Sequence, residues 1–166
     1  MQTLEQQIAR RYPHWFRGRR AVLAKPLLRS LGRWSGLDHV FEFLASHADA
    51  SGFALIDAAM DYLNLRYDVD AAERKRIPSV GRLLIVANHP SGALDALSLL
   101  HLVGSVRRDV RIVANDLLGQ VEGLRELLLP VRILGGKPSE DSIEAIHQAL
   151  REEQCVIVFP AGEVSR

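Results

Sequence analysis

The spacing of hydrophobic residues divides the chain into two parts. Before residue 64, apolar side chains recur at helical intervals over 21–34, 37–45 and 53–63. From residue 64 onward, short apolar runs of strand length alternate with stretches of helical composition. We therefore predict an all-helical extension over residues 1–63 and an α/β domain over residues 64–166.

The alternation of strands and helices in the second part indicates a mostly parallel sheet with flanking helices. The sequence ends directly after its last expected strand, although a parallel strand normally has both faces covered. We therefore expect this to be the front part of a longer protein. The expected strands are 65–69, 82–87, 110–114, 131–134 and 155–159, and the expected helices are 93–103, 117–128 and 139–150. Ser51 is the expected N-cap of the helix over 53–63, and Ser139 is the expected N-cap of the helix over 139–150.

The composition is that of a soluble globular domain with 166 residues, of which 48% are hydrophobic and 25% charged. The single cysteine, Cys155, excludes an intrachain disulfide, and its apolar neighbours favour a place in the core. No apolar run approaches the roughly 20 residues of a membrane span, and the start lacks the pattern of a signal peptide. We expect a cytoplasmic protein that contacts the inner face of the membrane only peripherally.

The charge is distributed unevenly. Residues 1–36 contain eight basic side chains and one acidic side chain, a net charge of +7, so the rest of the chain carries −6 of the total of +1. Trp15, Phe16 and Trp34 lie among these basic residues, a pattern that suits an anionic lipid surface. The same pattern also suits nucleic acid, a weaker reading here, or an ordinary solvated helical face.

The stretch 83–95 carries the first candidate chemistry. It reads as a strand, a tight loop broken by Pro90 and Gly92, and a helix. His89 lies in the loop at the carboxyl end of the strand, where open α/β sheets bind their ligands, and Asp95 follows about one helical turn into the helix. A histidine oriented by a carboxylate is a candidate general base. Alternatively, His89 only caps the loop and Asp95 only complements the helix dipole.

A second loop, 159–166, follows the last expected strand and opens on the same edge of a parallel sheet. Its Arg166 suits a phosphate, and Gly162 gives the loop freedom. A base and a phosphate ligand in one cleft suggest group transfer onto a hydroxyl of a phosphorylated acceptor. Serine-hydrolase, zinc and P-loop motifs are absent from the sequence, so no metal ligands are predicted.

These two loops resemble sequence blocks of the glycerolipid acyltransferase superfamily, in its hemolysin-like branch. Asn88-His89-Pro90-Ser91-Gly92-Ala93-Leu94-Asp95 is similar to the first block, and 159–166 to the F-P-E-G-T-R-S block. The similarity covers residues 65–166. It implies an enzyme that moves a fatty acyl group from a thioester to the hydroxyl of a lysophospholipid or similar lipid, without an acyl-enzyme.

The resemblance also implies roles for individual residues. His89 would take the proton of the acceptor hydroxyl, and Asp95 would orient His89. Loop backbone N–H groups would hold the oxyanion. No bound cofactor is implied, because acyl-CoA or acyl-ACP is a co-substrate, and acyl carrier protein is thus a possible partner. The expected substrate-binding residues are Asn88, Ser91 and Gly92 in the first loop and Gly162, Glu163 and Arg166 in the second.

The chain departs from the family pattern in spacing and in charge. Five residues separate His89 from Asp95, where four are common, and on a regular helix one extra residue turns a side chain by about 100°. Ala161 stands where many members carry an acid, and Arg132 lacks the acid that usually accompanies it. Two other functions stay open at this point: a non-catalytic membrane-associated lipid-binding protein of the same fold, and a thioester hydrolase.

Overall fold

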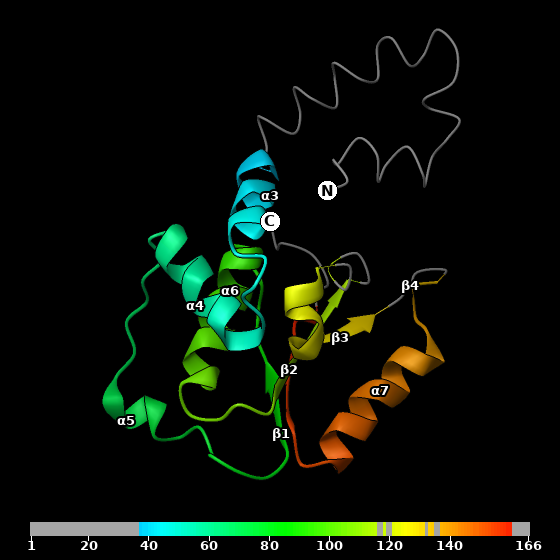
Figure 1. Ribbon diagram of the computed structural model, residues 1–166. Coiled ribbons are helices and arrows are strands. Elements are labelled where there is room, and N and C mark those ends of the chain that lie inside the picture. Colours follow the sequence, from blue (N-terminus) through cyan, green and yellow to red (C-terminus); the bar gives the residue numbers. More distant parts are fainter. Residues whose placement is uncertain (1–36, 116–117, 119–120, 132, 135–136, 161–166) are drawn as a thin grey trace, which may run out of the picture. The chain divides into compact units, whose positions relative to one another are not determined.

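The computed structural model (Figure 1) describes residues 37–115, 118, 121–131, 133–134 and 137–160. The chain forms two compact units, residues 1–46 and 47–166. The first contains helix α3 (Leu37–Ser46). The second contains the sheet and also residues 47–63, which we assigned to the extension. Within the described residues, no helix combines the length and apolar character needed to cross a membrane.

A four-stranded, all-parallel sheet forms the centre of the second unit, as the sequence predicts. The strand order is β1-β6-β2-β3, so the first and last strands of the chain are neighbours. A separate antiparallel pair, β4 with β5, lies outside this sheet. The bounds are β1 Leu83–Val86, β2 Val110–Asn115, β3 Leu128–Val131, β4 Ile133–Leu134, β5 Lys137–Pro138 and β6 Cys155–Val158.

Helical connections produce this order. Helix α6 (Ala93–Gly104) leads from β1 to β2, and the 3-10 helix η3 (Glu122–Leu127) precedes β3. Helix α7 (Glu140–Arg151) then returns the chain to β6, which enters the sheet between β1 and β2. Because all four strands are parallel, the loops after β1 and β6 leave the sheet side by side at one edge.

Two helices cover one face of the sheet, and a third covers part of the other (Figure 1). Helix α4 (Gly52–Tyr62) and α6 pack on the inner face of β1, β2 and β6. Helix α7 packs on β3 and β6 across the sheet, where Val156 is fully buried. The main cluster contains Ile56 and Met60 of α4, Leu100 and Val103 of α6, and Val110, Ile112, Cys155 and Ile157 of the sheet.

Among the described residues, strand β1 is covered on one face and exposed on the other. Leu83 and Ile85 pack against the core, whereas Leu84 and Val86 are exposed on the opposite face. The all-apolar sequence of β1 is typical of a strand that is buried on both faces. Here the described residues bury only the face that carries Leu83 and Ile85. Cys155 is confirmed as a core residue: it is fully buried, and burial raises the pKa of its thiol to about 11.

Residues 65–69 are not a strand, contrary to the prediction. Leu65 and Tyr67 pack against the core while Arg66 and Asp68 are exposed, so the alternation of burial is real. No strand of the described sheet pairs with this segment. An extended segment that lies along the core produces the same period of two as a strand, without sheet hydrogen bonds.

The predicted helix over 117–128 and the strand over 131–134 also need correction. The described helical residues in this range are Leu118 and those of η3, all in 3-10 conformation, and the strand begins three residues earlier, at Leu128. Leu128 is buried against the core, which favours the extended conformation there. Pro130 pairs with Ala114 on β3, an edge strand of the described sheet, where a missing N–H is tolerated.

The expected N-caps have different outcomes. Ser139 caps α7, because its side chain accepts a hydrogen bond from the backbone N–H of Ser142. Ser51 occupies the N-cap position of α4, but its side chain makes no capping hydrogen bond. On α7, the buried positions are Ser142 and Ala149, whereas Ile143 is exposed.

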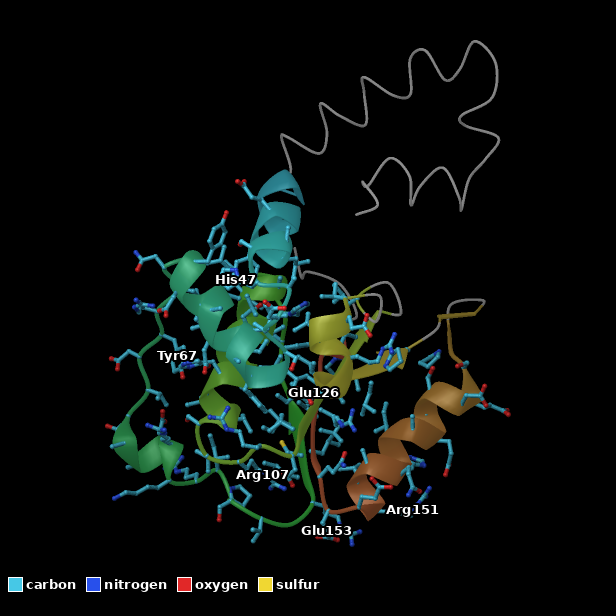
Figure 2. The ribbon with its side chains drawn as sticks, viewed as in Figure 1. His47, Tyr67, Arg107, Glu126, Arg151 and Glu153 are labelled. Carbon is cyan, nitrogen blue, oxygen red and sulfur yellow. The ribbon has the colours of Figure 1, made fainter. Side chains whose placement is uncertain are left out.

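A buried arginine joins the segments that enter the sheet (Figure 2). The Arg107 guanidinium donates two hydrogen bonds of 2.7 Å to Asp109 and one each to the carbonyls of Pro78 and Glu153. Arg82, which precedes β1, pairs with the Glu153 carboxylate at 2.7 Å. These contacts connect the starts of β1, β2 and β6 at the edge opposite His89.

We expect Arg107→Met to lower the free energy of unfolding by about 3 kcal/mol, because it removes the four hydrogen bonds that the buried guanidinium donates to Asp109 and to the Pro78 and Glu153 carbonyls. The matched control is Arg108→Met: Arg108 is exposed, and its guanidinium lies 4.8 Å from the centre of the Phe53 ring. That variant should cost less than about 1 kcal/mol. Urea unfolding measures both, and equal losses would contradict the anchoring role of Arg107.

The same contacts predict an acid-sensitive contribution to stability. Hydrogen bonds from Arg107 lower the pKa of Asp109, and hydrogen bonds from the Arg82 backbone and side chain lower the pKa of Glu153. The unfolded chain therefore binds protons at a higher pH than the folded chain. The contribution is present above about pH 5 and is lost as the pH falls through the lowered pKa values.

Urea unfolding at a series of pH values checks this expectation. The free energy of unfolding should fall on acidification in the wild type, and less steeply in Arg107→Met, which lacks the Asp109 partner. Arg108→Met should keep the wild-type slope. Identical slopes in all three proteins would show that Asp109 does not contribute.

Candidate active site

The loop after β1 places His89 at the carboxyl edge of the sheet, as predicted. The backbone N–H of Ala87 still donates to the carbonyl of Val158, at 3.2 Å, so the pairing of β1 with β6 extends to two residues before His89. Residues on the two loops therefore start from adjacent, hydrogen-bonded positions. This pairing determines what surrounds the imidazole.

His89 and Asp95 come together despite the five residues between them. The distance from His89 Nδ1 to Asp95 Oδ2 is 3.6 Å, and the two side chains are 19% and 27% exposed. The loop accommodates the additional residue before the helix begins, since α6 starts only at Ala93. The turn of about 100° that a regular helix would impose is thus avoided.

Gly92 and Ser91 explain this local geometry. Gly92 stands at the N-cap of α6 with φ +63° and ψ −127°, a conformation that side chains disfavour. The backbone N–H of Ser91 donates a 2.7 Å hydrogen bond to Asp95 Oδ2. The carboxylate is therefore held by the loop that carries His89. Of the residues predicted to contact substrate, Asn88 and Ser91 are exposed beside His89.

The two nitrogens of the imidazole have different surroundings. Nδ1 is buried and has no hydrogen-bond partner among the described residues, and the Asp95 carboxylate lies just beyond hydrogen-bond length from it. A proton on Nδ1 would face that carboxylate. With the proton on Nδ1, Nε2 would carry the lone pair that can accept a proton.

The sequence interpretation did not include Phe159 among the site residues. Its ring stacks on the His89 imidazole, with 4.2 Å between the ring centres and 24° between the planes. Phe159 follows β6 directly and packs against the core cluster. The sequence shows an aromatic residue directly after the last strand. This could have indicated a neighbour for His89 only if the adjacency of β6 and β1 had been known.

The second loop cannot be compared with its prediction. Gly162, Glu163 and Arg166 lie outside the described residues, as does Arg132. The suggested phosphate ligand and acceptor site therefore stay predictions. Across the part of the chain that the structure describes, no group of three or more histidine, cysteine and acidic side chains could hold a metal ion.

A second histidine, His101 on α6, has two polar neighbours. His101 Nδ1 lies 2.7 Å from the Tyr67 hydroxyl, and His101 Nε2 lies 3.8 Å from Asp57 Oδ1. Burial raises the pKa of Tyr67, so its hydroxyl stays protonated and can donate to His101. The contact ties the extended segment 65–69 to α6, which makes it a structural link.

A family model described as an acyltransferase matches residues 27–166. The chain belongs to this acyltransferase family. That match includes both loops and most of the predicted extension. It confirms the acyltransferase resemblance noted in the sequence, while the hemolysin-like branch stays a prediction. No solved structure matches the chain.

Two curated relatives are described as lyso-glycine lipid O-acyltransferases. The protein of Phocaeicola vulgatus is 29% identical over 130 residues, which are 78% of this chain and 46% of that protein. The protein of Bacteroides thetaiotaomicron is 30% identical over 130 residues, 78% of this chain and 47% of that protein. The chain thus spans about half the length of the curated relatives it matches.

The conformation of Gly92 gives a test of the site's construction. Gly92→Ala should destabilise the folded chain by about 1–3 kcal/mol, because a side chain disfavours the φ and ψ of this residue. The matched control is Ala93→Gly at the adjacent, exposed position, which should cost about 1 kcal/mol or less. Urea unfolding compares the two variants, and an unchanged midpoint in Gly92→Ala would mean that the turn does not require glycine.

Proposed function

We propose that this acyltransferase-family chain transfers a fatty acyl group from an acyl thioester to the hydroxyl of a lysolipid. The observation that carries the proposal is the approach of His89 Nδ1 to Asp95 Oδ2, 3.6 Å apart, at the carboxyl edge of the sheet. Membership of the acyltransferase family and the names of both curated relatives support transfer to a lipid rather than to another acceptor.

The chemistry needs no covalent enzyme intermediate. His89 Nε2 takes the proton of the acceptor hydroxyl as its oxygen attacks the thioester carbonyl carbon. The tetrahedral intermediate then collapses, the C–S bond breaks, and the imidazolium returns the proton to the leaving thiolate. Asp95 stabilises the imidazolium, and N–H groups of the loop stabilise the oxyanion. The products are the acylated lipid and a free thiol.

The donor, acceptor and location follow as parts of the same proposal. The thioester, acyl-CoA or acyl-ACP, is a co-substrate, so the reaction as written uses no bound cofactor. The acceptor is a lysophospholipid or a lyso-glycine lipid, the latter because it appears in the names of both curated relatives. Residues 1–36, with a net charge of +7, would attract the protein to the anionic inner face of the membrane.

The test measures thiol release from an acyl thioester by the protein as its gene encodes it. Acyl-CoA and acyl-ACP are each offered with lysophosphatidate, other lysophospholipids or a lyso-glycine lipid, and without acceptor. We expect release that requires a lysolipid. His89→Ala should lower the rate by about 10²–10⁴-fold, because the general base is lost. His147→Ala, an exposed histidine on α7, is the matched control and should retain activity.

Other outcomes distinguish the remaining functions. Thiol release that proceeds equally without acceptor would identify a thioester hydrolase. Binding to anionic vesicles with no release from either donor, unchanged in His89→Ala, would identify a non-catalytic lipid-binding protein. Acceptor-dependent release that persists in His89→Ala would remove His89 from the mechanism.

A further inference from the structure

We propose that Phe159 is a positioning residue for His89, whose ring fixes the plane of the catalytic imidazole. The inference rests on the acyl-transfer function proposed above. It assigns to Phe159 a task that neither Asp95 nor the loop backbone performs. Two observations support it: the Phe159 ring stacks on the imidazole, and the contact from His89 Nδ1 to Asp95 Oδ2 is longer than a hydrogen bond.

The contact with Asp95 alone is a weak constraint on the imidazole. The distance from Nδ1 to Oδ2 is 3.6 Å, and Nδ1 makes no hydrogen bond to any described residue. The same carboxylate oxygen already accepts a 2.7 Å hydrogen bond from the Ser91 N–H. A single long contact at one corner of a ring leaves the ring free to turn about the Cβ–Cγ bond.

The stack with Phe159 supplies the missing constraint. The ring centres are 4.2 Å apart and the planes differ by 24°, so the phenyl ring lies against one face of the imidazole. A quarter turn of the imidazole about Cβ–Cγ would drive its edge into the phenyl ring. A half turn would preserve the stack but move Nδ1 away from Asp95. Phe159 thus fixes the plane, and Asp95 selects which edge faces inward.

Phe159 is itself held rigidly. It follows β6, whose residues Cys155, Val156 and Ile157 are fully buried, and its ring packs against the core cluster. The hydrogen bond from Ala87 N–H to the Val158 carbonyl joins the two strands immediately before both loops. The orientation of the imidazole therefore depends on the core of the domain, through one aromatic side chain.

Proton NMR of the histidine rings tests the stack without any substrate. In ¹³C-histidine-labelled protein, the ring protons of His89 should lie upfield because they face the phenyl ring. Phe159→Leu should move them downfield, whereas Phe159→Tyr should leave them near the wild-type position. His89→Ala assigns the signals. The matched control is Tyr67→Leu, which should move the His101 signals alone, since Tyr67 contacts His101 edge to face. Unchanged His89 signals in Phe159→Leu would overturn the stack.

Steady-state kinetics test the positioning role. Phe159→Leu should lower kcat about 3- to 10-fold, the range that corresponds to one aromatic pair, with little change in KM for the thioester. Phe159→Tyr should restore kcat, because it keeps the ring. The double variant Phe159→Leu/Asp95→Asn should lose less than the product of the two single losses, since both act through one imidazole.

Each failure has its own signature. A wild-type kcat in Phe159→Leu, or a change confined to KM, would overturn the positioning role while leaving the acyltransferase function intact. If the wild type transfers no acyl group, the function and the role in catalysis fall together, and the NMR experiment still decides whether the stack exists. Should Phe159→Leu not fold, Phe159→Met takes its place, and unchanged His89 signals or a wild-type kcat in that variant would overturn the proposal.

Discussion

The parallel pairing of β1 with β6 is the contact on which the candidate site depends. The two strands are more than 60 residues apart in sequence, since Leu83 pairs with Cys155. Their adjacency requires α7 to return the chain across β2, so that β6 enters between β1 and β2. Only then do the loop with His89 and the loop that begins at Phe159 leave the sheet together. Without this topology, His89 and Asp95 would still be close, but the imidazole would have no aromatic neighbour.

The two edges of the sheet differ in how tightly hydrogen bonds hold their side chains. At the edge where the strands begin, the buried Arg107 makes hydrogen bonds to Asp109 and to the carbonyls of Pro78 and Glu153. This network fixes the positions of three segments with short contacts and little freedom. At the opposite edge, His89 Nδ1 makes no hydrogen bond to any described residue, and Asp95 Oδ2 lies 3.6 Å from it. The strand starts are thus held by several short hydrogen bonds, whereas the described residues hold the His89 imidazole at the strand ends with few contacts.

The sequence was informative where the local pattern and the final packing agree. The hydrophobic runs of β1, β2 and β6 and the Ser139 cap of α7 are local signals, and the structure confirms them. The pattern failed at 65–69, because packing against the core produces the same alternation as pairing in a sheet. It failed again at 117–128, where the buried Leu128 begins a strand. The proximity of His89 and Asp95 was expected from the loop, whereas the Phe159 stack depends on the strand order, which no local pattern reveals.

Within the proposed mechanism, Phe159 and Asp95 constrain different motions of the imidazole. The Asp95 carboxylate, 3.6 Å from Nδ1, faces the edge of the ring and can stabilise the imidazolium once a proton is taken up. The phenyl ring of Phe159 lies against the face of the imidazole and restricts its rotation. The two contacts therefore divide the task of orienting His89 between an edge and a face of one ring. Gly92 makes the division possible, since its φ of +63° lets the loop turn Asp95 toward His89 over the longer spacing.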